Sequence, residues 1–454
     1  MMKYPTLLFF VFFTTILSGQ NQSLSPLVSG PMLGFVEHRS AYIWYEVNQD
    51  VKKASLRYWE QNNIDIYYEM DYKGELGHPF NPISFELVNL KMNTSYEYEI
   101  VLNNKVIPMV KVPAFRTKEL WEYRKDAPDF SFTIGSCTFL NDETYDKPGK
   151  PYGQDPAILS TMGNFSTDFM IWLGDNLYYR EADYSSKAGM QYRCSYNRKT
   201  PQMQPLLSSR PNFAIWDDHD YGPNDSNLSS DLKETSLELF KTYWGNKTYG
   251  EKNNPGIYSK FSWSDCDFFL TDNRYHRSPN ALHDSINGEP NCDKHYFGDQ
   301  QLEWLKNSLL TSSATFKFIA SGSQVLNPFN EKECLRNSMC EFDDLLNFIS
   351  DYKISGIVFL TGDRHYSEVI KHQSDNGYAL YDITSSPITS GVYDVSTTKH
   401  AKNPSRVPGT LVVENNFTVI NIKGKPGDRT LQMKCYNKAA EERSNFSINE
   451  KELK

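Results

Sequence analysis

The stretch FMIWLGDNLY at residues 169–178 decides the expected fold. Its first five residues are apolar, which is typical of a short strand buried on both faces. Gly174 then permits a sharp turn, and Asp175 follows directly after the strand. The stretch therefore predicts a buried strand with a carboxylate at its carboxyl end.

The same arrangement recurs along the chain, with apolar runs that end in polar clusters. Such runs occupy 130–134, 213–216, 268–271, 316–320 and 357–361, and the clusters after them include Gly135-Ser136-Cys137, Asp217-Asp218-His219-Asp220, Asp272-Asn273-Arg274 and Gly362-Asp363-Arg364-His365. Helical patterns lie between them at 232–244, 301–310 (with Asp299 as the expected N-cap) and 342–349. This alternation predicts a layered α/β core, with its functional site at the carboxyl ends of the strands.

The sequence outside this core contains no candidate catalytic or ligand residues. Residues 25–117 contain short strand patterns at 40–46, 54–59, 64–68 and 95–102, which predict a small β-sandwich with a structural or lid role. A charged linker at 121–128 leads to the predicted catalytic domain at 128–438. That domain ends in a hairpin at 417–422 and 430–435, and residues 439–454 are predicted to form a peripheral charged tail.

The first residues resemble an export signal. Lys3 precedes an apolar run at 7–17 that is too short to cross a bilayer comfortably, so residues 1–19 are predicted to be a cleaved signal peptide, and an uncleaved anchor is the alternative. The mature protein is therefore expected to be secreted or periplasmic and not to span a membrane. Export permits disulfides among the seven cysteines, and Cys334 and Cys340 are close enough for a local pair.

The composition of the 454 residues favours a globular protein of two domains. A net charge of −9 argues against a stable nucleic-acid partner, whose binding surface is usually basic. An anionic substrate is still compatible with this charge, because bound metal ions supply positive charge locally.

The polar clusters offer ligands for metal ions. Hydrolysis of a phosphate ester needs charge neutralisation and an activated water, and two metals about 3.5–4 Å apart provide both. Such a site needs oxygen, nitrogen or sulfur ligands from several strand ends and one bridging carboxylate. The sequence offers Cys137, Asp175, Tyr178, Asp217, Asp218, His219, Asn224, Asp363 and His365.

Taken together, these clusters resemble the PhoD-like alkaline phosphatase and phosphodiesterase family. The resemblance rests on Gly-Ser-Cys at 135–137, Gly-Asp-Asn-Leu-Tyr at 174–178, Trp-Asp-Asp-His-Asp at 216–220, Gly-Asp-Arg-His-Tyr at 362–366 and Ser-Ser-Pro-Ile-Thr at 385–389. It implies a metallophosphoesterase core of two sheets flanked by helices, behind an N-terminal β-sandwich. It also implies a ferric ion (Fe³⁺) beside a calcium ion (Ca²⁺).

The resemblance also implies which residues hold these ions. Asp175 would bridge them, Cys137 and Tyr178 would bind iron, and Asn224, Asp363 and His365 would hold calcium. A phenolate suits ferric iron, and calcium prefers carboxylate and amide oxygens. The loop that follows His219 departs from the family pattern, so Asp225 or Asn227 could take the place of Asn224.

Other candidate residues have two interpretations each. His219 could orient a ligand or contact the substrate, or it could protonate the leaving alcohol. Arg274 and Arg364 could contact phosphate oxygens, although a salt bridge to Asp272 or another neighbour is the alternative for Arg274. Cys137 could instead be a packed thiol or half of a disulfide.

The predicted protein is thus an exported monomeric phosphoesterase in which a metal-bound hydroxide attacks phosphorus, with Asp175, His219 and Arg364 as catalytic residues. Arg274 and His219 are its candidate substrate-binding residues. A calcineurin-like enzyme with two ordinary divalent ions and a non-catalytic scaffold are the rival interpretations. The sequence leaves the small phosphate-ester substrate open between monoesters and diesters, including nucleotides, phospholipid headgroups and polyol-phosphate polymers.

Overall fold

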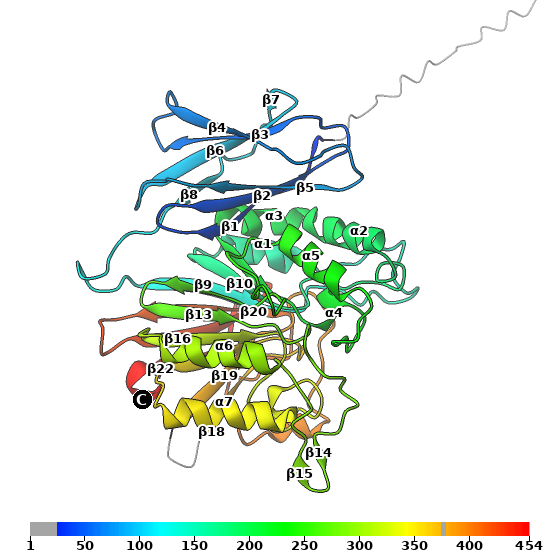
Figure 1. Ribbon diagram of the computed structural model, residues 1–454, viewed down its shortest axis with the longest axis vertical. Coiled ribbons are helices and arrows are strands. Elements are labelled where there is room, and N and C mark those ends of the chain that lie inside the picture. Colours follow the sequence, from blue (N-terminus) through cyan, green and yellow to red (C-terminus); the bar gives the residue numbers. More distant parts are fainter. Residues whose placement is uncertain (1–24, 374–377, 454) are drawn as a thin grey trace, which may run out of the picture.

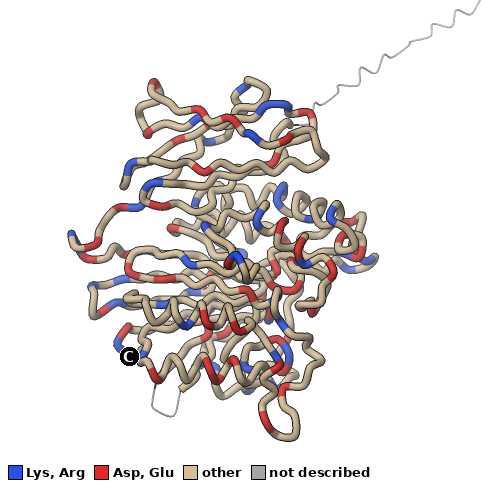
Figure 2. Tube along the Cα trace, viewed as in Figure 1, with Lys and Arg blue, Asp and Glu red and all other residues tan. Residues whose placement is uncertain are grey.

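The computed structural model describes residues 25–373 and 378–453, and the predicted signal peptide at 1–19 lies outside them. The N-terminal sandwich forms the upper part of the molecule and the catalytic domain the lower part (Figure 1). Lys and Arg are interspersed with Asp and Glu over both parts (Figure 2). Among the described residues, no helix has the length and apolar character needed to cross a bilayer.

The N-terminal domain is a sandwich of two small antiparallel sheets. One sheet has the order β1-β2-β5, and the other has the order β4-β3-β6-β7, with β8 also paired to β6. Its strands are β1 (Leu27–Val36), β2 (Ala41–Val47), β3 (Ala54–Glu60), β4 (Tyr67–Asp71), β5 (Asn81–Leu87), β6 (Ser95–Leu102), β7 (Lys105–Val106) and β8 (Ala114–Arg116). The predicted strand at 64–68 begins later, because Ile64 and Ile66 lie exposed in the preceding turn.

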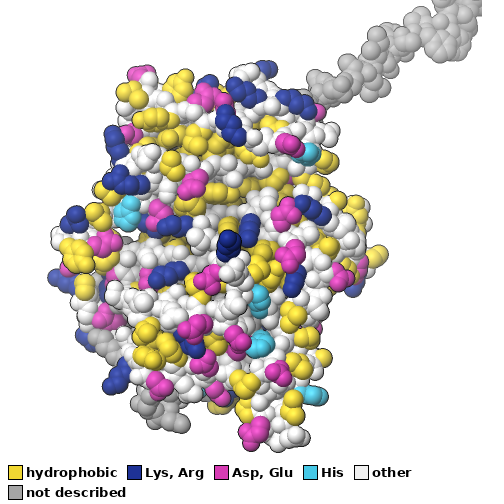
Figure 3. Space-filling view, in the orientation of Figure 1, with side chains coloured by type: hydrophobic (Ala, Val, Ile, Leu, Met, Phe, Trp, Pro, Cys, Tyr) yellow, Lys and Arg dark blue, Asp and Glu magenta, His cyan; other side chains and the backbone are white. Residues whose placement is uncertain are grey.

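The sandwich is bonded firmly to the catalytic domain through β1 and β2. Phe35 N donates to Gly245 O (3.0 Å) and Trp44 Nε1 donates to Thr242 O (2.9 Å). Met32, Phe35 and Trp44 belong to the same hydrophobic core as the catalytic domain. Hydrophobic side chains also reach the outer surface of the sandwich (Figure 3), and those with high exposure include Ile64, Ile66, Tyr67 and Tyr68.

Two six-stranded sheets form the centre of the catalytic domain. The first has the order β11-β10-β9-β20-β21-β22, and the second has the order β12-β13-β16-β17-β19-β18. The first contains β9 (Phe130–Gly135), β10 (Phe169–Leu173), β11 (Asn212–Ile215), β20 (Asn416–Lys423), β21 (Thr430–Asn437) and β22 (Glu442–Asn449). The second contains β12 (Ser259–Trp263), β13 (Cys266–Leu270), β16 (Phe316–Ser321), β17 (Ile357–Thr361), β18 (Glu368–Gln373) and β19 (Ala379–Thr384).

Aromatic side chains join the facing surfaces of these sheets. The ring of Phe132 lies 5.2 Å from Phe268 and 5.3 Å from Phe318, and Phe169 lies 5.3 Å from Phe268. All of these contacts are between edge-on rings, a geometry that aromatic pairs favour. The phenylalanines that predict buried strands therefore also hold the two sheets together.

Helices cover the outer face of each sheet (Figure 1). The first sheet is covered by α1 (Ala157–Asn164), α2 (Lys187–Arg198), α3 (Gln204–Ser209) and α5 (Lys233–Tyr243), and the second by α6 (Asp299–Leu310) and α7 (Met339–Asp351). Short elements complete the chain: α4 (Asp218–Tyr221), β14 (Ser285–Ile286), β15 (Glu289–Pro290) and the 3-10 turns η1 (Pro201–Met203), η2 (Leu335–Asn337), η3 (Lys399–Lys402) and η4 (Glu450–Leu453).

Three local expectations are wrong. The residues after 438 do not form a separate tail, because β22 pairs along β21 and extends the first sheet. Gly298, rather than Asp299, precedes the first turn of α6. Cys340 forms its disulfide with Cys292, and Cys334 is a free buried thiol.

Candidate metal centre

The carboxyl ends of strands from both sheets meet at one edge of the catalytic domain. Cys137 N, which follows β9, donates to Gly174 O (3.2 Å), which follows β10. Gly362 N, which follows β17, donates to Gly322 O (2.9 Å), which follows β16. Ser136 Oγ crosses between the sheets and donates to Ser385 O (2.9 Å). The polar residues after these strands are thereby brought together.

The glycines of the two Gly-Asp motifs are required by this close approach. Gly174 has a φ of +89°, and a Cβ there would lie 2.9 Å from the Cβ of Asp217. A Cβ on Gly362 would lie 2.7 Å from Leu173 O. Both positions exclude larger residues on steric grounds. The recurrence of glycine before aspartate therefore reflects the convergence of these strand ends.

Four of the six ligands implied by the family resemblance have a left-handed backbone. The φ angles are +61° at Cys137, +51° at Asp175, +67° at Asp363 and +58° at His365. Non-glycine residues seldom adopt this conformation, which is concentrated at functional sites where the surrounding structure enforces it. Each of these residues follows a buried strand, so the rigid sheets fix the direction of its side chain.

Four side chains form the first group of potential ligands. The Sγ of Cys137 and the hydroxyl of Tyr178 lie 3.5 Å and 3.1 Å from Oδ2 of Asp175. The Tyr178 hydroxyl also lies 3.4 Å from Nε2 of His365. Cys137, Asp175 and His365 can place ligand atoms within 4.8 Å of one another, a spacing that suits one metal ion. His365 therefore groups with Cys137 and Tyr178, whereas the resemblance implies that it holds calcium.

Asp175, Asp218 and His219 form the second group, with ligand atoms again within 4.8 Å of one another. Asp218 and His219 lie in α4, whose start is fixed by a hydrogen bond from Asp217 N to Oδ1 of Asp220 (2.6 Å). His219 N donates to Oδ1 of Asp175 (3.3 Å), which ties the two strand ends together. Asp175 thus belongs to both groups, as expected of a bridging carboxylate. The residues of the two groups, together with Asp363, are called the strand-end cluster below.

The electrostatics of the strand-end cluster favour a bound cation. Burial, together with the neighbouring Cys137 and Asp218, raises the pKa of Asp175 well above its usual range. Burial also raises the pKa of Asp363 to about 7, although Arg364 opposes the shift. Oδ2 of Asp363 is buried and accepts no hydrogen bond from the described residues. Oxygen, sulfur and imidazole donors held this close need a positive charge among them, so the residues fit a metal site.

Cys137 is a free thiol within this site. It is fully buried, and burial raises its pKa to about 12. The hydroxyls of Ser136 and Ser386 lie 3.4 Å and 3.2 Å from its Sγ. Hydrogen bonds of this kind stabilise a thiolate when a cation is bound, and the disulfide alternative is excluded by the structure.

Asp217 and Arg274 belong to a buried ionic network behind the cluster. The guanidinium of Arg274 pairs with Asp217 and, at 2.6 Å, with Glu333, and it lies 3.9 Å from Asp218. Arg274 is fully buried, so the salt-bridge alternative describes it, with Asp217 and Glu333 as its partners. The expectation that Arg274 contacts the substrate is wrong, and Asp217 is engaged by the same ion pair.

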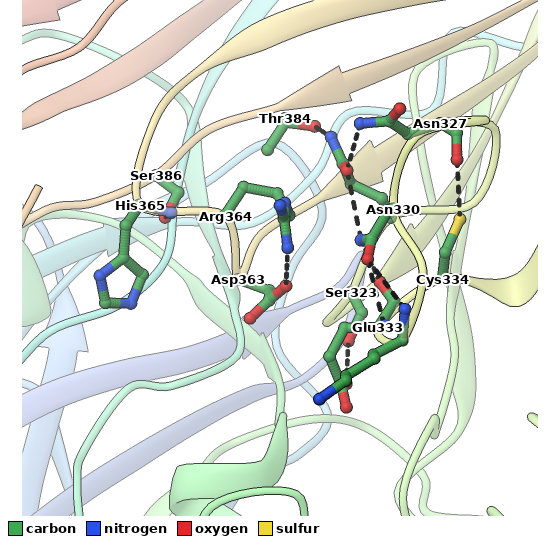
Figure 4. Close-up of polar contacts among 12 residues, drawn as sticks. Ser323, Asn327, Asn330, Glu333, Cys334, Asp363, Arg364, His365, Thr384 and Ser386 are labelled. Carbon is green, nitrogen blue, oxygen red and sulfur yellow. Dashed lines mark hydrogen bonds and ion pairs between the residues drawn. The ribbon is translucent and has the colours of Figure 1, made fainter. Parts of the chain in front are cut away.

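Arg364 lies beside Asp363, with its Nη1 3.6 Å from Oδ2 of that residue. Figure 4 shows the guanidinium turned toward Asp363, while His365 lies on the opposite side of Asp363 from Ser323 and Glu333 in this view. The Arg364 Nε is buried and has no hydrogen-bond partner among the described residues. The Arg364 side chain as a whole is 16% exposed, so part of it faces the open edge of the cluster.

Asn224 is not brought to the cluster. It is exposed and lines a surface cavity of about 510 Å³ together with Asp225 and Asn227, the two residues that could have taken its place; Cys137, Asp175, Tyr178, Asp363 and His365 do not line that cavity. In the same loop, Asp225 N donates to Oδ2 of Asp218 (2.8 Å). The Gly-Pro turn at 222–223 thus directs Asn224 outward, and the backbone N–H of Asp225 positions Asp218.

Sequence reasoning missed Tyr152 and the roles of Ser386 and Gly391. The Tyr152 hydroxyl lies 3.1 Å from Nδ1 of His365, and Gly391 O lies 2.6 Å from the same atom. Ser386 Oγ accepts from His365 N (2.9 Å). Tyr152 lies in a loop with no recognisable pattern, whereas the segment at 385–389 already carried part of the family resemblance.

Comparisons with known proteins agree with this geometry. The model of the PhoD-like phosphatase family matches residues 151–421. The chain belongs to this family. Alkaline phosphatase D from Bacillus subtilis (strain 168) is 23% identical in an alignment of 401 residues, which covers 76% of this chain and 66% of that relative. The chain therefore spans just under two thirds of the length of the curated relative that it matches.

Solved structures show the same fold. The structure of PhoD superposes with a TM-score of 0.74 at 15% identity, over 94% of this chain and 93% of that one. A purple acid phosphatase from yellow lupin (Lupinus luteus) seeds gives a TM-score of 0.64 at 10% identity, over 92% of this chain and 74% of that one. The family model confirms the predicted family, and the solved structures confirm the layered α/β core.

Proposed function

We propose that this chain is an exported, metal-dependent hydrolase that cleaves phosphate mono- or diesters at the strand-end cluster. The observation that carries the proposal is the convergence of Cys137, Asp175, Tyr178 and His365 from separate strand ends of both sheets. A non-catalytic scaffold has no physical need for Asp175 and Asp363, whose pKa values are raised by burial and by the neighbouring acids Asp217 and Asp218.

The proposed metals are a ferric ion and a calcium ion. Cys137, Tyr178 and His365 would hold iron, Asp175 would bridge, and Asp218 and Asp363 would hold calcium. Asp218 replaces Asn224 in this proposal because Asp218 is buried within the second group and Asn224 is exposed. When bound, such ions neutralise charge on the phosphate ester and lower the pKa of the attacking water.

The protein supplies orientation and hydrogen bonds around this centre. The imidazole of His219 packs on the ring of Tyr178, with centroids 4.2 Å apart, and is half-buried, so one edge faces the open side. Burial lowers the pKa of His219, so we propose a neutral imidazole that hydrogen-bonds the substrate rather than an acid. The guanidinium of Arg364, whose side chain is 16% exposed beside Asp363, is proposed to donate to a phosphate oxygen.

Export is supported by the Cys292–Cys340 disulfide, because disulfides persist mainly in oxidising compartments. The proposed location is outside the cytoplasm, either secreted or periplasmic. N-terminal sequencing of the natural protein checks this, and a retained first residue would contradict cleavage of 1–19.

Replacement of Tyr178 by Phe tests the ferric-iron assignment. The unaltered protein is expected to be coloured by a visible absorption band of the ferric–phenolate pair, and the variant is expected to lose that band. Absorption spectra of both proteins, recorded beside their iron content, measure the effect.

Replacement of Tyr184 by Phe is the control, since Tyr184 lines the separate surface cavity. It is expected to keep the band. A Tyr178→Phe protein that contains iron and shows an unchanged band would remove Tyr178 from the ligand set.

A further inference from the structure

Tyr152 lies at the open edge of the strand-end cluster. Its side chain is 47% exposed, although its ring packs edge-on against Phe139 with centroids 4.9 Å apart. A Cβ on Gly391 would lie 2.9 Å from this ring, so the backbone there closes tightly on it. These contacts hold the ring in place while part of it faces solvent.

The Tyr152 hydroxyl does not donate its hydrogen to His365, its hydrogen-bond partner. His365 Nδ1 lies 2.6 Å from Gly391 O, and a carbonyl oxygen only accepts, so Nδ1 must carry the hydrogen. The Tyr152 hydroxyl, 3.1 Å from the same Nδ1, therefore cannot donate to it. A phenol is protonated at neutral pH, so the Tyr152 hydroxyl still has a hydrogen that it can donate to another group.

The other nitrogen of the His365 imidazole shows where the Tyr152 hydroxyl lies relative to the metal-ligand atoms. Nε2 of His365 faces Tyr178 and, through it, Asp175. The Tyr152 ring lies 6.4 Å from the ring of Tyr178. The Tyr152 hydroxyl thus lies on the solvent side of the strand-end cluster, and only the His365 imidazole separates it from Tyr178 and Asp175.

We propose that Tyr152 contacts the substrate and donates its hydroxyl hydrogen to a phosphate oxygen. This inference rests on the proposed function of the cluster. A phosphate that reaches the buried ligands from the open side passes the hydroxyl, and a neutral donor there strengthens binding without adding charge.

Replacement of Tyr152 by Phe removes this donor and keeps the ring. The variant is expected to lose about tenfold in kcat/KM on a chromogenic phosphodiester and to bind inorganic phosphate about tenfold more weakly, the scale of one hydrogen bond to a charged group. Enzyme kinetics and calorimetric titration with inorganic phosphate measure the two effects. Metal content and urea midpoint are expected to be unchanged.

Replacement of Tyr145 by Phe is the matched control. Tyr145 lies in the same loop, is 43% exposed and packs on Tyr192. The Tyr145→Phe variant is expected to retain the kinetics and phosphate affinity of the unaltered protein.

Equal phosphate affinity in the Tyr152→Phe and unaltered proteins would overturn the inference. An equal loss of phosphate affinity in Tyr152→Phe and Tyr145→Phe would also overturn it. Absence of ester hydrolysis by the unaltered protein would instead contradict the proposed function, and the phosphate titration would still test Tyr152.

Discussion

Replacement of Asp175 by Asn is expected to lower kcat/KM for phosphate esters by about 10³-fold, because metal stabilisation of the transition state amounts to several kcal/mol and each tenfold corresponds to about 1.4 kcal/mol. Asp175 belongs to both ligand groups, so one neutral amide weakens both. The amide keeps the shape of the side chain, and the fold is expected to persist. Kinetics on a chromogenic phosphodiester and elemental analysis of the same sample measure the change.

The control for this variant is Asp343→Asn, which removes the same charge from an exposed position on α7. Its activity and metal content are expected to match those of the unaltered protein. If Asp175→Asn retained both full activity and full metal content, Asp175 could not be the bridging ligand.

Replacement of Arg274 by Met is expected to destabilise the protein by about 3–5 kcal/mol, the cost of leaving buried charges without their partner. Asp217 and Glu333 would both lose the guanidinium that neutralises them, and Asp217 is fully buried. Met fills most of the same space, so the lost charge dominates. Urea unfolding followed by fluorescence measures the free energy of unfolding.

Two further variants separate charge from packing. Arg443→Met breaks the pair with Glu414 on the surface, where the Arg443 side chain is 44% exposed, and is expected to cost less than about 1 kcal/mol. The double variant Arg274→Met, Asp217→Asn removes a positive and a negative charge and should recover part of the loss. Equal losses for Arg274→Met and Arg443→Met would show that the buried network contributes no more than a surface pair.

The strands could be predicted because their burial leaves a simple signal. The runs at 169–173 and 357–361 match β10 and β17 residue for residue, since strands covered on both faces are apolar throughout. The first strand, β1, was missed because Gly30, Pro31 and Gly34 interrupt it, and such residues argue against a strand. Its pairing with β2, which tolerates register shifts along the strand, and its packing on the catalytic domain override that local preference.

The helix α2 was missed for a different reason. Its buried face contains Arg193, Asn197 and Arg198, so it lacks an apolar periodicity. Arg193 is instead satisfied by Asp142 and Asp183 at 3.3 Å and 2.7 Å. Acidic residues that lie far from α2 in the sequence allow its polar face to be buried. A local sequence pattern cannot predict these partners.

In the candidate site, too, some residues could be predicted from the sequence and others could not. The strand-end acids could be found because rigid strands place them, whereas Asn224 and Tyr152 lie in loops whose direction depends on contacts with other segments. The pairing of Cys340 with Cys292 also depends on the folded chain, since the two are 48 residues apart. Spacing alone favoured the nearer Cys334.

The most direct measurement is elemental analysis combined with phosphodiesterase assay of one preparation, before and after exhaustive chelation. We expect iron and calcium in the active protein, loss of hydrolysis when they are removed, and recovery when both are restored. Two ordinary divalent ions in place of iron and calcium would correct the metal assignment alone. Full activity in a metal-free protein would contradict hydrolysis at the strand-end cluster.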